Sequence, residues 1–102
     1  MISPQLESRI RLALEDTARR SGRDPAKLRV VLAAPVTWSD GSMGCPQPGQ
    51  FYTQALVPGY RIVIAADSET FEYHGASNGE PFYCPPERLR APPSDSPGGF
   101  RS

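Results

Sequence analysis

The segment Tyr60-Arg-Ile-Val-Ile-Ala-Ala-Asp-Ser-Glu-Thr-Phe-Glu-Tyr-His74 decides the fold. Alternate residues of its first half are apolar and fall on one face of a strand: Tyr60, Ile62 and Ile64. In its second half Phe71 and Tyr73 alternate with polar residues, which is the pattern of a second strand. Asp67-Ser68 between the two halves is typical of a tight turn. The segment therefore predicts an antiparallel hairpin.

Upstream of this hairpin, residues 4–20 predict an α-helix. Ser3 suits the N-cap, Pro4 suits the first helical position, and Gly22 is a natural residue to follow the last turn. The apolar residues recur at helical spacing and form one stripe: Leu6, Ile10, Ala13, Leu14, Thr17 and Ala18. Such a stripe must be buried, and we expect the helix to pack across the sheet.

Three other segments predict further strands. Residues 28–38 read as one strand, in which Pro35 marks an edge, a bulge or a break because it has no N–H to donate. Residues 51–57 predict a short strand that ends at Pro58-Gly59, and residues 82–84 predict the last strand. The predicted fold class is α+β, with one N-terminal helix packed on a three- to four-stranded antiparallel sheet.

The 102 residues suffice for one small domain. We assign residues 1–84 to a single α+β domain and residues 85–102 to a disordered, proline-rich C-terminal tail. The tail has too few apolar residues to offset the entropy lost on ordering.

The charge balance and the hydropathy pattern limit the classes of partner. The chain has 11 basic and 11 acidic side chains, so its formal net charge is zero. A general nucleic-acid or membrane-surface binder needs a net basic field, so we expect neither activity. No apolar run approaches the ~18–20 residues that span a bilayer, so we expect no transmembrane segment.

Cys45 and Cys84 are the only cysteines, and an even number in a short chain favours a disulfide. The bridge would close a loop of about 40 residues, and the chain-entropy model gives it roughly 3–4 kcal/mol of stabilisation. It would join a Pro/Gly-rich loop to the last predicted strand. A pair of free buried thiols and a metal site are the alternatives.

The cellular compartment depends on the redox state of these cysteines. If the disulfide forms, we expect a periplasmic or extracellular protein. If Met1 is the native start and the thiols are free, we expect a cytoplasmic protein. Charged residues in the first twenty positions exclude a signal peptide there.

His74 is the only histidine, and it raises the possibility of chemistry with the cysteines. A metal-binding or thiol-redox protein that uses Cys45, His74 and Cys84 is one alternative function. Structural zinc sites usually contain a close pair such as Cys-x-x-Cys, which is missing from the sequence. We therefore predict no metal, cofactor or catalytic residue, and we expect His74 to face solvent or to make one hydrogen bond. The acidic Asp67, Glu69 and Glu72 are explained by the turn and an exposed strand face.

Residues 42–50 (Ser-Met-Gly-Cys-Pro-Gln-Pro-Gly-Gln) form the most distinctive loop. Two prolines and a disulfide would keep it stiff, and a stiff loop loses little entropy on binding. The candidate binding residues are Ser42, Met43, Gly44, Pro46, Gln47 and Pro48. A rigid structural connection is the alternative interpretation, and a protease inhibitor that presents residues 42–50 is an alternative function.

Four aromatic residues offer a second candidate surface: Trp38, Phe51, Tyr52 and Tyr60. An exposed platform of this kind would suit a sugar, a base or a peptide. In a domain of this size, the alternative is that they lie in the core or at its rim, with their polar atoms hydrogen-bonded.

The run from Val36 to Gly49 is followed by three shorter motifs: Tyr52-Thr53-Gln54, Pro58-Gly59-Tyr60-Arg61-Ile62 and Tyr73-His74 with Cys84. This pattern, W-x-D-G-S-x-G-C-P-x-P-G…Y-T-Q…P-G-Y-R-I…Y-H…C, resembles a family of small uncharacterised bacterial domains. Most members are hypothetical proteins, and many are exported proteins or lipoproteins. The resemblance implies no activity. It implies that five residues belong to one structural unit: Trp38, Asp40, Cys45, Gln54 and Tyr60.

The function expected from the sequence is that of a non-enzymatic binding or accessory module of a bacterial cell envelope or a larger protein assembly. Within residues 28–66 the only charged side chains are Arg29, Asp40 and Arg61, so the helix or a partner must cover much of this segment. Functional polar groups do not converge in the sequence. We expect the partner to be a protein.

Overall fold

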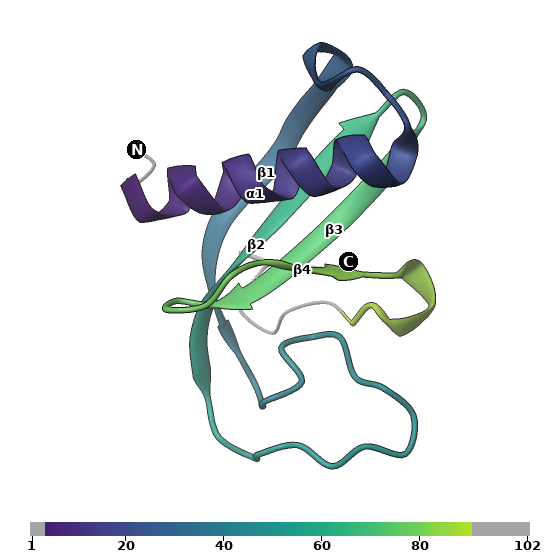
Figure 1. Cartoon of the computed structure of the whole chain (residues 1–102). Helices are drawn as coiled ribbons and strands as arrows, with labels where there is room; N and C mark the ends of the chain where they lie inside the picture. Colours follow the sequence, from purple (N-terminus) through teal and green to yellow (C-terminus); the bar gives the residue numbers. More distant parts are fainter. Residues whose placement is uncertain (1–3, 91–102) are drawn as a thin grey trace, which may run out of the picture.

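The computed structural model describes residues 4–90, so the predicted disorder of residues 91–102 lies outside the described residues. The elements in chain order are α1 (Pro4–Ser21), the 3₁₀ turn η1 (Pro25–Lys27), β1 (Leu28–Trp38), β2 (Val57–Ala66), β3 (Glu69–Ala76), β4 (Phe82–Cys84) and the 3₁₀ turn η2 (Pro86–Arg88). The helix lies across one face of the four-stranded sheet (Figure 1). The predicted α+β class is confirmed.

The sheet is antiparallel throughout, and its strands follow one another in the order β1-β2-β3-β4. The hairpin predicted from the sequence is formed by β2 and β3, with Asp67 at φ 57° in the tight turn. Its register places Ile62 opposite Tyr73 and Ile64 opposite Phe71. The apolar residues of both strands therefore share the face that α1 covers.

This helix-side core consists of buried residues from α1, β2 and β3: Ala13, Tyr60, Ile62, Ile64, Ala66, Phe71 and Tyr73. Two of its aromatic residues, Tyr60 and Tyr73, also make polar contacts. The Tyr73 hydroxyl donates a hydrogen bond to Asp16 over 2.7 Å and lies 3.0 Å from the Thr17 hydroxyl. These contacts fix the C-terminal half of α1 on β3 and satisfy the polar tip of a buried aromatic side chain.

The short strand predicted at residues 51–57 is wrong, because residues 51–56 are irregular and β2 starts at Val57. The predicted break at Pro58-Gly59 is also wrong, since β2 continues through it. The Pro58 carbonyl accepts a hydrogen bond from Ser77 N–H, so the proline nitrogen also points away from β1. The missing N–H therefore costs no bond in the β1–β2 ladder.

β1 lies at one edge of the sheet and is irregular there. Its pairing with β2 is interrupted by a bulge between Val30 and Leu32, and Pro35 pairs with Tyr60 further along the strand. Of the three alternatives that the sequence left open for Pro35, the structure shows the edge strand. Within residues 4–90, no helix has both the length and the apolar character needed to cross a bilayer.

Candidate functional site

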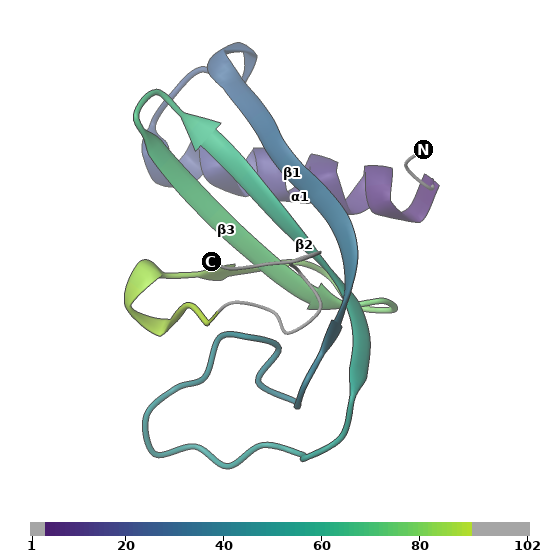
Figure 2. The ribbon, with the colours of Figure 1, turned by 180° about the vertical axis from the view of Figure 1, so that it is seen from behind.

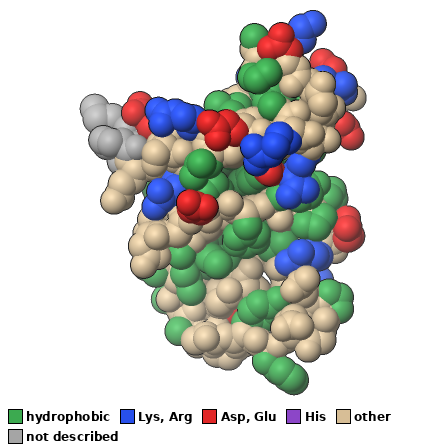
Figure 3. All heavy atoms as spheres, in the orientation of Figure 1, with side chains coloured by type: hydrophobic (Ala, Val, Ile, Leu, Met, Phe, Trp, Pro, Cys, Tyr) green, Lys and Arg blue, Asp and Glu red, His purple; other side chains and the backbone are tan. Residues whose placement is uncertain are grey.

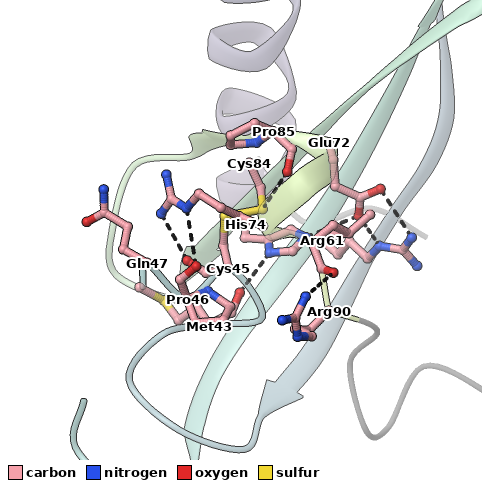
Figure 4. Close-up of a disulfide and its surroundings, with 12 residues drawn as sticks. Met43, Cys45, Pro46, Gln47, Arg61, Glu72, His74, Cys84, Pro85 and Arg90 are labelled. Atoms are coloured by element: carbon pink, nitrogen blue, oxygen red, sulfur yellow. Dashed lines mark hydrogen bonds and ion pairs between the residues drawn. A yellow bond between two sulfur atoms is a disulfide. The ribbon is translucent and has the colours of Figure 1, made fainter. Parts of the chain in front are cut away.

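The sheet face opposite α1, here called the outer face, carries a cluster of polar and aromatic side chains. The β2–β3 register pairs Arg61 with His74, and the β3–β4 register pairs Glu72 with Cys84. Trp38 reaches the same face from the end of β1. The close-up in Figure 4 shows Arg61, Glu72 and His74 beside the Cys45–Cys84 disulfide. Strand pairing brings Arg61 of β2 beside Glu72 and His74 of β3.

The connection between β1 and β2 spans residues 39–56 and leaves the sheet at one end of these strands (Figure 2). It has two parts, which differ in how they contact the sheet. Residues 40–46, here called the anchored segment, return to the outer face and bond to it. Residues 47–56, here called the exposed lobe, extend away from the sheet.

Trp38 is fully buried and forms the floor beneath the anchored segment. Its indole N–H donates to the Gly75 carbonyl over 3.1 Å, and its ring centroid lies 4.5 Å from that of His74. Gly44 passes directly over this ring with φ +73°, and a Cβ at this position would lie 2.8 Å from the indole. The anchored segment can approach Trp38 only because residue 44 has no side chain.

His74 is fully buried, so the prediction that it faces solvent or makes a single bond is wrong. Its Nδ1 lies 2.7 Å from the Met43 carbonyl oxygen, and its Nε2 lies 3.1 Å from a Glu72 carboxylate oxygen. Both partners are acceptors. The imidazole therefore links β3 to the anchored segment through the Met43 carbonyl.

Glu72 is also mostly buried, with 12% of its side chain exposed, so the prediction that it occupies an exposed strand face is wrong. Burial alone would raise the pKa of this carboxyl. Hydrogen bonds from His74 and Arg61, together with the charge of Arg61, outweigh burial and hold the pKa of Glu72 below its ordinary value. The cluster thus holds the Glu72 carboxylate between Arg61 and His74.

Cys45 in the anchored segment and Cys84 in β4 form the predicted disulfide, with their Cα atoms 5.9 Å apart. Both residues are almost completely buried. While the bridge is intact, neither sulfur is available as a metal ligand or a nucleophile. In the part of the chain that the structure describes, no group of three or more His, Cys, Asp and Glu side chains could hold a metal ion.

The anchored segment is also bonded within the loop. The Asp40 carboxylate accepts hydrogen bonds from the Ser42 N–H and hydroxyl, at 2.9 Å and 2.6 Å. Gly41 N–H donates to the Thr53 carbonyl over 2.8 Å, which ties the two sides of the loop together. The loop therefore forms hydrogen bonds within itself, and short side chains and turn residues allow its backbone to fold closely enough for them.

Residues 85–90, which the sequence analysis assigns to the tail, pack against the anchored segment. Arg88 donates to the Cys45 carbonyl over 2.9 Å and to the Pro46 carbonyl over 3.3 Å. Arg90 N–H donates to the Gly44 carbonyl over 2.8 Å. The assignment of these six residues to a disordered tail is corrected, because irregular loop carbonyls need donors and this segment supplies them.

The predicted binding loop is therefore divided by the structure. Ser42 is buried, while Met43, Gly44 and Pro46 are half-buried against the sheet. Only Gln47 and Pro48 of the predicted set are exposed. A protease inhibitor acting through residues 42–50 would have only residues 47–50 available to an enzyme.

The exposed lobe carries the most accessible apolar side chains of the described residues. Phe51 is 99% exposed and Leu56 is 71% exposed. The lobe contains a hydrogen bond of its own: Gln47 N–H donates to the Tyr52 hydroxyl over 2.9 Å. Figure 3 shows hydrophobic side chains at this end of the molecule, one of them projecting from the surface. The lobe thus has local order but leaves its apolar side chains uncovered.

The four predicted aromatic residues do not form one surface. Trp38 and Tyr60 are buried on opposite faces of the sheet, Tyr52 is half-buried, and Phe51 alone is fully exposed. Leu56 was not predicted as a site residue. The available signal was its position two residues before Pro58, in a segment rich in turn residues and poor in charge.

A model of a domain of unknown function, DUF8738, matches residues 10–84. No curated protein and no solved structure matches the chain. The predicted resemblance to a family of small uncharacterised domains is confirmed by this match. The bacterial origin and the export of its members stay predictions.

Proposed function

Since the chain belongs to the DUF8738 family of domains of unknown function, we propose from its own geometry that it is a non-enzymatic module that binds a protein partner through the exposed lobe. The observation that carries the proposal is the exposure of Phe51 and Leu56 on a loop whose base is fixed. The expected partner surface has an apolar hollow that receives the Phe51 ring, with Leu56 packing beside it.

The free energy of burial supports this use of the lobe. Covering a fully exposed phenylalanine side chain contributes roughly 1.5–3 kcal/mol. Within this chain, Phe51 gains none of that stabilisation because almost all of its surface faces water. Protein interfaces are enriched in such aromatic side chains, which pack into pockets of the partner.

The fixed base of the loop supports the same proposal. The Cys45–Cys84 bridge, the His74 contact with Met43 and the Arg88 contacts with Cys45 and Pro46 hold one end of the lobe. At the other end, Leu56 runs directly into β2. A loop held at both ends loses less conformational entropy when it binds, and more of the contact energy then appears as affinity.

The outer-face cluster supports a non-enzymatic role. His74, Glu72 and Arg61 bond to one another, and Trp38 with the anchored segment covers the histidine. A general acid or base must reach the proton that it transfers. These groups instead stabilise the connection between the loop and the sheet. The buried disulfide favours an oxidising compartment, such as the bacterial cell envelope.

The test is site-specific photocrosslinking in the cells that produce the protein. A photoreactive phenylalanine derivative replaces Phe51 in one variant and Leu56 in another. The matched control position is Val31, which is also apolar and 54% exposed but lies in β1. We expect one defined crosslinked protein from both lobe positions and not from Val31.

The purified partner then allows the affinity to be measured. Phe51→Ala should weaken binding by about tenfold or more, as expected for a central aromatic anchor. Val31→Ala should leave the affinity unchanged. Crosslinks that are equal at all three positions, or an absence of crosslinks from a protein that is monomeric in solution, would contradict the proposal.

A further inference from the structure

A pocket lies on the helix side of the sheet, away from the loop. The N-terminal half of α1 extends beyond β1 (Figure 1), and its residues line the pocket together with residues of β1 and β2. Its volume is about 200 Å³. Its lining combines polar and apolar side chains: Gln5, Leu6, Arg9, Pro35, Tyr60 and Ser77. Pockets for drug-sized ligands measure roughly 300–1,000 Å³, so this one suits a smaller molecule.

Arg9 is the unusual residue of this pocket. Its Nε atom is buried and has no hydrogen-bond partner. Other arginines of the described residues form ion pairs: Arg19 and Arg20 with Asp16, Arg23 with Asp67, and Arg61 with Glu72. Among residues 4–90, Arg9 has no such pair. A buried guanidinium N–H without an acceptor is costly, and an anion in the pocket would supply the acceptor.

The helix sequence explains why Arg9 lacks a carboxylate. Side chains three and four positions apart are neighbours on a helix, and around Arg9 these are Gln5, Leu6, Leu12 and Ala13. Arg11, two residues later, has Glu7 and Glu15 at the same spacing. The two arginines therefore differ in whether their own helix places acidic groups beside them.

Tyr60 contributes to the pocket, and its hydroxyl interacts with the Arg9 side chain without neutralising the charge of that arginine. Its hydroxyl donates to the Gly79 carbonyl over 2.8 Å. Burial raises the pKa of Tyr60 to about 12, so the phenol is uncharged at neutral pH. The remaining polar groups that can donate to a ligand are the Gln5 amide and the Ser77 hydroxyl. Leu6 and Pro35 supply apolar walls.

We propose that this pocket binds a small monocarboxylate with a short branched aliphatic chain. The carboxylate would accept hydrogen bonds from the Arg9 guanidinium, whose planar donors match its two oxygens. The aliphatic part would lie against Leu6 and Pro35. Glu80 acts on Tyr60 electrostatically from nearby, and its negative charge opposes the binding of an anion.

The experiment titrates the ¹⁵N-labelled full chain with 3-methylbutanoate and, as a matched neutral ligand, with 3-methylbutanamide. We expect saturable shifts of the Gly59, Tyr60 and Ser77 amide signals, and at least about tenfold weaker binding of the amide. Arg9→Gln should remove this preference for the acid. Arg11→Gln is the matched control and should keep it.

Three results would overturn the proposal: no saturable shift at these amides, equal binding of acid and amide, or an equal loss in Arg9→Gln and Arg11→Gln. If Arg9→Gln fails to fold, Glu80→Gln replaces it. Removing this charge should tighten binding of the acid by about twofold and leave binding of the amide unchanged. Unchanged or weaker binding of the acid by Glu80→Gln would also overturn the proposal.

Discussion

The two faces of the sheet are covered in different ways. On one face a regular amphipathic helix buries an apolar core that includes Ala13, Ile62 and Phe71. On the other face an irregular loop covers Trp38 and His74. A helix satisfies its own backbone groups, so hydrophobic burial is enough to hold it. An irregular cover leaves backbone carbonyls that need donors from elsewhere.

The outer face shows how this need is met. The Met43 carbonyl receives a hydrogen bond from His74, the Gly44 carbonyl from Arg90 N–H, and the Cys45 carbonyl from Arg88. The disulfide adds a covalent link beside them. On the helix face the polar contacts of the core come from the hydroxyls of Tyr60 and Tyr73, and apolar packing supplies the rest. Removing the disulfide or a hydrogen bond of the outer face should therefore loosen the loop. Removing apolar packing on the helix side should instead loosen α1.

Removing the disulfide should have the largest effect. The cysteines are separated by 39 positions, and the chain-entropy model gives the bridge roughly 3–4 kcal/mol. We expect Cys45→Ala combined with Cys84→Ala to lower the free energy of unfolding by about this amount, measured by urea denaturation. Hydrogen exchange should quicken first at residues 40–46, while α1 stays protected.

The matched control for the disulfide variant is Ile62→Val in the helix-side core. This substitution should lower the free energy of unfolding by about 0.5–1.5 kcal/mol. It should leave the rate of hydrogen exchange in the loop unchanged relative to the rest of the chain. If hydrogen exchange in the cysteine variant quickens equally in α1 and in residues 40–46, the helix and the loop do not have separate roles.

A substitution at Gly44 should have the second largest effect. Gly44→Ala places a Cβ against the Trp38 ring and 3.1 Å from the Arg90 carbonyl, which we expect to cost about 1–3 kcal/mol beyond backbone strain. Gly49→Ala is the control, because Gly49 has a similar φ of +81° with no atom within 4 Å of the added Cβ. The difference in stability between the two variants, measured by thermal unfolding, isolates the steric contribution. Equal losses of stability would show that only backbone strain destabilises Gly44→Ala.

Acid should weaken the outer face through Glu72, with a smaller effect. The folded protein holds the pKa of this carboxyl below its ordinary value, so the unfolded chain binds more protons in that interval. The contribution of Glu72 to stability is therefore complete above its unfolded pKa and is lost as the pH falls through its folded pKa. We expect Glu72→Gln to reduce the slope of stability against pH in the acid range.

The comparison for this titration is Asp16 on the helix side. Burial would raise the pKa of Asp16, but hydrogen bonds from Tyr73 and Arg20 hold it below its ordinary value. Its side chain is more exposed than that of Glu72, so Asp16→Asn should change the slope less. Denaturation midpoints between neutral pH and pH 2 measure both variants. A slope unchanged in Glu72→Gln would show that the carboxyl is not coupled to folding.

Phe51→Ala should have the smallest effect on stability. The side chain is exposed and supports nothing beneath it, so the free energy of unfolding should change by no more than about 0.5 kcal/mol. The same substitution should weaken partner binding strongly. A large loss of stability in this variant, measured by urea denaturation, would place Phe51 in the folded framework and not at an interface.

Local patterns were enough to predict the helix-side half of the molecule. The alternation in residues 60–74 and the helical stripe of residues 4–20 each depend on neighbours in sequence, and both were confirmed. The Cys45–Cys84 pairing was also predicted, because two cysteines allow only one bridge.

The outer face depends on contacts between distant residues, and local patterns miss these. The burial of His74 requires Trp38 and the anchored segment to cover it, which strand alternation does not encode. The order of residues 85–90 depends on carbonyls some forty positions earlier in the chain. Within the candidate site, the sequence analysis selected residues that lie mainly in the anchored segment, because prolines and glycines mark rigid turns and exposed turns alike.

The bulge in β1 has a consequence for the solubility of the protein. β1 is an edge strand with partly exposed Val30 and Val31, and a long regular edge of this kind can recruit a strand from another chain. The bulge breaks the two-residue repeat beside Val31, and Pro35 offers no N–H further along. An incoming strand would lose its register twice within one element. The irregularity therefore protects the folded chain against growth of an intermolecular sheet.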